Sequence, residues 1–185
     1  MNSMSFLIST LFDLYIMVVL LRIWLQASRA DFYNPFSQFI IKATQPVIGP
    51  LRRVIPSIGN IDMATLLFAY VLCVLKFVVL LLVLSKGAVG FDVSFFSWGA
   101  LSLIKAAGGL LFWVLLIRAI LSWVSQGRSP IEYVFNQLTE PMLAPIRRVL
   151  PAMGGFDLSV LVLFIALQFA NFLMGDLIGP MWFSL

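Results

Sequence analysis

The side chains that could bind ions or phosphates gather in a block of sequence that occurs twice, 95 residues apart. In each copy an arginine pair is followed nine residues later by an aspartate, which gives Arg52, Arg53 and Asp62 in the first copy and Arg147, Arg148 and Asp157 in the second. Prolines keep the same spacing, at Pro46, Pro50 and Pro56 and at Pro141, Pro145 and Pro151. Because chance does not preserve so many positions over this distance, the chain consists of two copies of one unit.

Each residue type in the block has two possible roles. The arginines can anchor the chain to lipid phosphates, or they can form a paired docking surface for a protein partner or an acidic lipid. Asp62 and Asp157 directly precede long apolar segments, so each can cap the helix that follows, where exposed backbone amides need acceptors. The other possibility is that these carboxylates bind a proton or a cation.

Asp13 and Lys76 are charged residues inside segments that are otherwise strongly apolar. At ~1.5 Å of helix per residue, they lie about 18 and about 21 Å from the ends nearest the repeated block, so antiparallel helices would bring them to a similar depth. The pair can fix helix register or belong to an ion or proton pathway, or Lys76 can reach the outer interface. The second copy lacks the pair, since Asn171 stands where Lys76 would be repeated.

The commonest general base and metal ligand, histidine, is missing from the sequence. There is no histidine, and Cys73 is the single cysteine, which leaves no zinc pattern, no intrachain disulfide and no histidine base. No phosphate-binding loop, dinucleotide fingerprint or nucleophile elbow is present. No basic run is interleaved with aromatic residues as nucleic-acid channels require. We therefore expect no enzyme, no metal, no cofactor and no nucleic-acid partner.

The elements that must position these residues are membrane spans. Apolar residues make up 62% of the chain and charged residues 11%, against about 45–50% and ~25% in soluble domains. A helix needs about 20 apolar residues to cross the hydrocarbon layer. Four stretches qualify, at residues 5–26, 63–85, 98–124 and 158–178. Each repeat, residues 1–90 and residues 91–185, thus has two spans that flank one motif-bearing loop.

We expect each motif-bearing loop to form a short amphipathic hairpin of broken helix in the headgroup layer. The first helices should cover residues 35–43 and 130–138. They should end before Pro46 and Pro141, because proline clashes with a continuing helical turn and cannot donate a hydrogen bond. The next proline of each block should start a second short helix that carries the arginine pair.

Two further features concern the spans themselves. Arg22 and Arg118 lie near the ends of the first and third spans and should reach toward the membrane surface, whereas Gly108-Gly109 should permit close helix packing. The predicted fold class is an all-α membrane protein, with four transmembrane helices in two parallel hairpin repeats.

The basic residues predict how the chain is oriented. They concentrate in the two motif-bearing loops, at Arg29, Lys42, Arg52 and Arg53 and at Arg128, Arg147 and Arg148. The positive-inside rule therefore places both loops in the cytoplasm and both termini on the other side. The formal net charge of +4 favours an anionic lipid leaflet as a partner.

The block T-[QE]-P-x-[IL]-x-P-[LI]-R-R-V-[IL]-P-x-[IM]-G-x-[IF]-D, with the preceding segments LLRIWLQ and LIRAILSWV, resembles the YggT family, also called YlmG. The resemblance covers about Leu7–Lys86 and Ala106–Ile178, in the two-unit form of Gram-negative bacteria. It implies a multi-pass protein of the bacterial inner membrane, linked to osmotic-stress tolerance, ion homeostasis and cell division. With the orientation predicted from the basic residues, both termini would be periplasmic. The resemblance implies no catalytic residues.

From these observations we expect a non-enzymatic membrane factor whose motif loops organise anionic lipids or a membrane complex, in osmotic-stress adaptation or cell division. The expected protein contact is a membrane-protein partner or a second copy of the chain. The alternative is a channel, transporter or accessory subunit for potassium ions or protons, for which Asp13 and Lys76 are the supporting residues.

Overall fold

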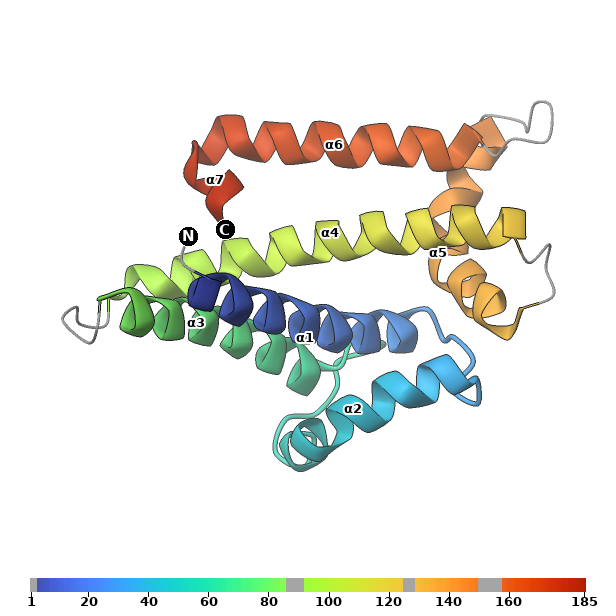
Figure 1. Ribbon diagram of the computed structural model, residues 1–185. Helices are drawn as coiled ribbons and strands as arrows, with labels where there is room; N and C mark the ends of the chain where they lie inside the picture. Colours follow the sequence, from blue (N-terminus) through green and yellow to red (C-terminus); the bar gives the residue numbers. More distant parts are fainter. Residues whose placement is uncertain (1–2, 86–91, 125–128, 150–157) are drawn as a thin grey trace. The chain divides into compact units, whose positions relative to one another are not determined.

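Seven helices make up the described part of the computed structural model, which covers residues 3–85, 92–124, 129–149 and 158–185 (Figure 1). They are α1 (Ser3–Ala27), α2 (Pro35–Leu51), α3 (Met63–Ser85), α4 (Ser94–Val124), α5 (Pro130–Val149), α6 (Leu158–Ile178) and α7 (Met181–Ser184). The described residues contain no strand, only an isolated bridge between Ile58 and Ile61. The all-α prediction is confirmed for this part of the chain.

Four of the helices are long and apolar enough to cross a membrane. The qualifying segments are Ser3–Ala27, Met63–Leu84, Ser94–Ser122 and Leu158–Ile178. They match the four predicted spans, except that the third helix begins at Ser94 and not near residue 98. The Asp92 side chain accepts a hydrogen bond from the Ser94 N–H at 2.9 Å, and this cap extends the helix beyond its most apolar part.

Side-chain caps also set where two other helices begin. Asn34 accepts a hydrogen bond from the Phe36 N–H at 3.0 Å. Pro35 occupies the first position of α2, where its missing N–H would have no helical partner. At the start of α3, the Asp62 carboxylate accepts a hydrogen bond from the Thr65 N–H at 3.3 Å. Both helices therefore start where local side-chain chemistry favours a start.

The prolines of the repeated block do not end the helices, contrary to the prediction. The two helices run without a break through Pro46 and Pro50 in α2 and through Pro141 and Pro145 in α5. A proline removes one amide donor and pushes away a carbonyl group, but neighbouring side chains can satisfy the carbonyls around such a turn. Next to Pro46, the Tyr15 hydroxyl donates to the Ala43 carbonyl oxygen at 3.5 Å. The Arg22 guanidinium donates to the Ile41 carbonyl oxygen at 3.3 Å.

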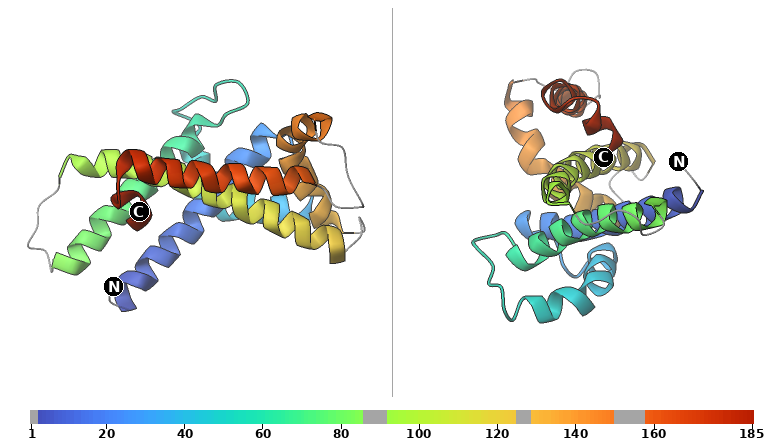
Figure 2. Two further views of the ribbon diagram at one scale, coloured as in Figure 1. Left: turned by 90° about the horizontal axis from the view of Figure 1, so that it is seen from above. Right: turned by 90° about the vertical axis from the view of Figure 1, so that its left-hand side faces the viewer.

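The first of two compact units comprises Met1–Ile23, Ile40–Ala107 and Leu185. Within it, α1 and α3 lie side by side (Figures 1 and 2), and the rings of Tyr15 and Phe68 meet edge to face at 6.1 Å. The first half of α4 approaches α3 closely, because a Cβ atom at Gly99 would lie 2.5 Å from Cγ2 of Val74. A glycine at this position allows the two helices to touch.

The second unit comprises Trp24–Phe39 and Gly108–Ser184. In it, the connection between α1 and α2 packs on α5. The Asn34 side chain donates a hydrogen bond to the Pro130 carbonyl oxygen at 2.7 Å, and the rings of Phe36 and Phe135 are 5.4 Å apart. The compact units therefore do not follow the sequence repeats, whose boundaries and hairpin arrangement stay predictions.

The short helix α7 turns back onto α6 in the same unit (Figure 2). Gly179 makes the turn with a φ of 95°, which glycine adopts without strain at the end of a helix. The Trp182 indole N–H then donates to the Asn171 side-chain oxygen at 2.9 Å. The Phe183 ring lies over Gly175, where it leaves no room for a Cβ atom.

Candidate functional site

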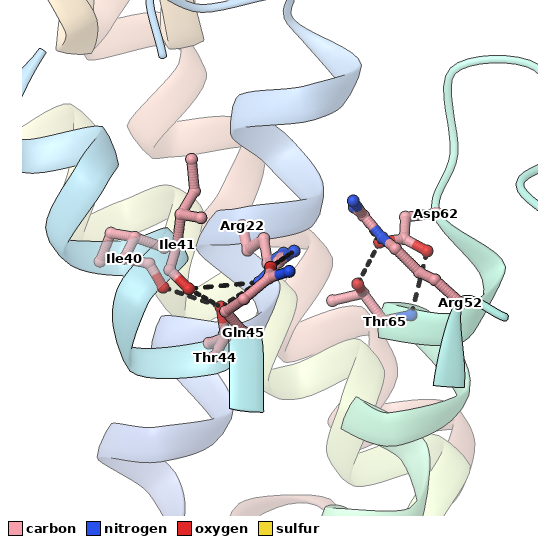
Figure 3. A network of polar contacts seen from close by, with 8 residues as sticks. All are labelled: Arg22, Ile40, Ile41, Thr44, Gln45, Arg52, Asp62 and Thr65. Carbon is pink, nitrogen blue, oxygen red and sulfur yellow. Dashed lines mark hydrogen bonds and ion pairs between the residues drawn. The ribbon is translucent and has the colours of Figure 1, made fainter. Parts of the chain in front are cut away.

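An arginine that the sequence predicts at the membrane surface is buried in the structure. Arg22 of α1 is 4% exposed. Its guanidinium donates to the Thr44 hydroxyl at 2.7 Å and to the Gln45 side-chain oxygen at 2.8 Å, both in α2 (Figure 3). The Thr44 hydroxyl donates its own hydrogen to the Ile40 carbonyl oxygen at 2.8 Å, so its lone pairs remain for Arg22. These acceptors carry no charge.

The second unit contains the same contact between α4 and α5. The Arg118 guanidinium donates to the Thr139 hydroxyl at 2.7 Å, and this hydroxyl donates to the Phe135 carbonyl oxygen at 2.8 Å. Arg118 also donates to the Asn136 side-chain oxygen at 2.8 Å. The surface prediction for Arg22 and Arg118 is wrong, because fixed acceptors on the next helix replace the water that these side chains would otherwise seek.

A recurring spacing in the sequence, which a hydropathy profile does not register, indicates these contacts. Arg22 precedes Thr44 by 22 residues, and Arg118 precedes Thr139 by 21. An arginine that recurs inside two apolar spans, at a nearly constant distance from a recurring hydroxyl residue, indicates a shared buried partner. The spacing alone does not reveal which helix presents that partner.

The two copies differ in charge at the position directly after the repeated threonine. Gln45 offers an amide oxygen to Arg22. At the matching position, Glu140 offers a carboxylate, which lies 3.6 Å from Arg118 and 2.9 Å from Arg147. Glu140 thus joins two guanidinium groups in the second unit, whereas the first unit has a neutral acceptor at this place.

In the first unit, the first arginine of the motif pair binds the aspartate that ends the block. Arg52 forms an ion pair with Asp62, and its Nε donates to Oδ2 at 2.7 Å (Figure 3). The Thr65 hydroxyl also donates to this carboxylate. The Asp62 side chain is fully buried, and the Arg52 side chain is 37% exposed. The structure therefore brings together two residues for which the sequence predicts separate roles.

The pKa of Asp62 lies below its usual value. Burial alone would raise this pKa, but the hydrogen bonds from Arg52 and Thr65 and the positive charge of Arg52 outweigh the effect of burial. Asp62 is therefore ionised at neutral pH, at the positive end of the α3 dipole. A carboxylate engaged in this way favours the capping role over the exchange of protons near neutral pH.

Arg147, the counterpart of Arg52, has a different acidic partner among the described residues. Its Nη1 donates to the two carboxylate oxygens of Glu140 at 2.9 and 3.0 Å. Asp157, which repeats Asp62 in the sequence, lies outside the described residues. The capping role of Asp157 therefore stays a prediction.

The second arginine of each pair faces outward. Arg53 and Arg148 are exposed, and neither forms an ion pair with another described residue. Each is followed by an exposed valine, because Val54 is 81% and Val149 is 78% accessible. The motif arginines therefore divide into one that binds an acid of its own unit and one that can meet an external anion.

Asp13 and Lys76 come together between α1 and α3 of the first unit. Lys76 Nζ lies 2.8 Å from Asp13 Oδ1, and the Ser9 hydroxyl donates to Oδ2 at 3.2 Å. The lysine side chain is 6% exposed, whereas the aspartate side chain is 42% exposed. The ion pair offsets the cost of burying the ammonium group. The carboxylate stays partly exposed at the surface of α1.

The charged side chains of the described residues form ion pairs and can bind anions. No group of three or more His, Cys, Asp and Glu side chains that could hold a metal ion occurs among them. The guanidinium groups, by contrast, are planar donors that match carboxylate and phosphate oxygens.

Comparisons with known proteins give the chain relatives along its whole length. A family model described as CCB3/YggT matches residues 1–83 and residues 97–178. A protein of Vibrio alginolyticus, described as an uncharacterized protein in the proC 3′ region, is 84% identical over 185 residues, which is 100% of each chain. The uncharacterized protein YggT of Escherichia coli strain K12 is 57% identical over 171 residues, which is 92% of this chain and 88% of that protein. An uncharacterized protein of Haemophilus influenzae is 39% identical over 185 residues, 98% of this chain and 97% of its own. No solved structure matches the chain.

Proposed function

The chain belongs to the CCB3/YggT family, and from that premise we propose that it is a non-enzymatic integral membrane protein whose motif loops organise anionic lipids, or a membrane complex, at the bilayer surface. The names of its relatives assign no reaction. The proposal therefore depends on what the side chains of this chain can bind.

The division of roles within each arginine pair supports this function. Arg52 and Arg147 are ion-paired to Asp62 and Glu140 of their own units. The next arginine in each block is exposed and has no ion pair with another described residue. Because a guanidinium binds phosphate or carboxylate oxygens through two parallel hydrogen bonds, these outward arginines are suited to lipid headgroups or acidic partner groups.

The proposed location is the bacterial inner membrane, with both motif loops in the cytoplasm and both termini in the periplasm. The concentration of basic residues in the two loops supports this orientation, and the anionic inner leaflet would attract them. The process served would be osmotic-stress adaptation or cell division. The protein contact would be a membrane-protein partner or a second copy of this chain.

The test is to replace the two outward arginines together, as Arg53→Gln with Arg148→Gln, and to measure the lipids and proteins that copurify in nanodiscs. The matched control is Arg29→Gln with Lys42→Gln, which removes the same charge from other exposed positions. Each basic residue near an anionic surface contributes about 1 kcal/mol, so we expect the first variant to lose about fivefold in anionic-lipid enrichment per arginine. Copurified proteins should fall in parallel if a membrane complex is the partner.

Equal losses in the motif variant and the control would show that only net charge matters, and the special role of the motif would be withdrawn. Unchanged lipids and unchanged protein partners in the motif variant would contradict the organising function as a whole. If the motif variant does lose lipids or protein partners, a growth assay under osmotic shock and a count of division defects would relate that loss to the process served.

A second candidate function, in ion movement, is favoured by one specific observation. Asp13 lies well inside a membrane-spanning helix, yet its side chain is 42% exposed. Ionisable residues within spans usually face a protein interior or a water-filled cavity. The test is potassium or proton flux into proteoliposomes, with the Asp13→Asn, Lys76→Met double variant as the comparison. Flux no greater than in empty vesicles would count against a channel or transporter.

A further inference from the structure

The nine residues between Arg52 and Asp62, residues 53–61, form a loop that we call the tip. The Arg52–Asp62 ion pair closes the base of the tip. Ile58 and Ile61 exchange two backbone hydrogen bonds of 3.1 Å each, and Gly59 between them has a φ of 60°. A positive φ at the first central position of a tight turn is a conformation that glycine adopts readily.

This turn presents two aliphatic side chains together. Residues that pair across a bridge project their side chains on the same side, so Ile58 and Ile61 form one apolar pair. They are 68% and 46% exposed, and Val54 at the base of the tip is 81% exposed. In water such an exposed group is unfavourable, but it is favourable at the boundary between headgroups and acyl chains.

The length of the chain sets the level of the tip in the membrane. Ile61 is two residues before Met63, where the span of α3 begins, and one residue covers at most about 3.6 Å. Ile61 thus lies within about 7 Å of the start of the span, with Ile58 only about 5.5 Å across the turn. Since the headgroup layer is about 5–7 Å thick on each side, Ile61 lies no further out than the headgroups, and Ile58 is next to it across the turn.

The charges around the tip select an anionic partner. Asp62 is the single acidic residue between positions 40 and 62, and it is buried and paired with Arg52. Arg53, beside Val54, is exposed. The same exposed Arg–Val step occurs at Arg148–Val149. The sequence that follows it has Met153 and Phe156 at the places of Ile58 and Ile61, outside the described residues.

Building on the function proposed above, we propose that the tip is a lipid-docking element. The side chains of Ile58 and Ile61 insert beneath the phosphates of the leaflet that α3 enters, and Arg53 binds the phosphate of an anionic glycerophospholipid. Lipid is the partner because the chain itself holds the turn at headgroup level, where lipid surrounds the protein.

The experiment uses the full chain in a Cys73→Ala background, so that an introduced cysteine is the single thiol. An environment-sensitive fluorophore is attached at Ile58→Cys, and in a matched control at Asn60→Cys, a central residue of the same turn. Both proteins are reconstituted in phosphatidylcholine vesicles with and without phosphatidylglycerol. Lipids with quenchers on the acyl chain or on the headgroup then report the depth of each probe.

We expect the Ile58 probe to emit further to the blue than the Asn60 probe and to be quenched more strongly by the acyl-chain quencher. Arg53→Gln should reduce the enrichment of phosphatidylglycerol around the tip by about fivefold, the effect of one basic residue at an anionic surface. Emission from an aqueous environment at position 58 would overturn the inference. Burial of that probe without quenching by lipid would also overturn it, since a protein would then cover the tip.

These outcomes separate the inference from the function on which it depends. If position 58 is in water but the outward arginines still determine anionic-lipid enrichment, only the docking of the tip fails. If the arginine variants leave lipids and copurified proteins unchanged, the organising function fails, whatever the depth of the probe.

Discussion

The guanidinium of Arg22 and the hydroxyl of Thr44 lie 2.7 Å apart, with both side chains buried. The bond joins the first span to the helix that carries the repeated block, and Arg118 with Thr139 joins α4 to α5 at the same distance. The contact is present in both copies, and in each it ties the motif helix to the span that precedes it. The positions of the outward arginines therefore depend on a polar contact inside the protein.

The first prediction is that Thr44→Val destabilises the protein although the two side chains have nearly the same shape. Valine removes the acceptor and leaves a buried N–H of Arg22 without a partner, at a cost of about 1–2 kcal/mol. Thr44→Ser keeps the hydroxyl and should cost less. Unfolding in mixed micelles measures both. Equal stability of the valine and serine variants would show that the hydroxyl is not what holds the helix.

The second prediction exchanges the residues that distinguish the two copies. Gln45→Glu places a carboxylate beside Arg22 and should stabilise the first unit by up to about 1 kcal/mol. Glu140→Gln removes the carboxylate that Arg118 and Arg147 share, and should destabilise by about the same amount. The midpoints of unfolding of the two variants should therefore move in opposite directions. Shifts of the same sign would contradict the electrostatic roles given to Gln45 and Glu140.

The third prediction concerns pH and the pKa of Asp62. Because its pKa is lowered in the folded protein, the stability that this carboxylate contributes is fully present above the pKa of the unfolded chain, about 3.9. It is lost as the pH falls below that value and through the lower pKa of the folded state. Asp62→Asn should lack this part of the acid dependence. Unfolding midpoints from pH 7 to pH 3 would test it, and parallel curves for both proteins would contradict it.

The parts of this fold that follow from local chemistry can be read from the sequence. The four spans follow from long apolar stretches, and the caps at Asn34 and Asp62 act on amides two or three residues away. The repeat also identifies the arginine pairs, whose members are alike in sequence. Their division into a paired and an outward arginine depends on which arginine reaches Asp62 or Glu140 across a turn of the chain, so it needs the three-dimensional structure.

The parts that depend on another helix cannot be read in the same way. Where α2 continues through Pro46, Tyr15 and Arg22 of α1 donate hydrogen bonds to nearby carbonyl oxygens, and the sequence does not specify that these side chains face α2. For the same reason, the close helix contact occurs at Gly99, although Gly108 and Gly109 are the more conspicuous glycines.

The fourth prediction uses two glycines of the same helix as test and control. At Gly99, a Cβ atom would lie 2.5 Å from Val74 Cγ2 and 3.3 Å from the Val74 backbone nitrogen. Gly99→Ala must therefore move α3 and α4 apart, at a cost of about 1–3 kcal/mol. At Gly108, a Cβ atom meets nothing within 4 Å, so Gly108→Ala should be neutral or slightly stabilising. Comparable losses of stability in both variants would contradict close packing at Gly99.

The fifth prediction is that removing one charge of the Asp13–Lys76 pair destabilises the protein more than removing both charges. Asp13→Asn leaves the ammonium of Lys76, which is 6% exposed, without its counter-ion, and breaking a buried ion pair costs about 3–5 kcal/mol. The open side of the carboxylate reduces this figure, so we expect the lower end. The unfolding midpoint in mixed micelles should fall accordingly.

The double variant Asp13→Asn, Lys76→Met decides between structure and ion movement. Removing both charges takes away the penalty of the unpaired ammonium, so stability should return to within about 1–2 kcal/mol of the unmodified protein. If this stable double variant also protects cells normally during osmotic shock, the pair fixes the register of α1 and α3 and nothing more. If it is equally stable but has lost ion flux in proteoliposomes, the charges serve the movement of ions. A purely structural role predicts instead that an equally stable variant keeps its flux.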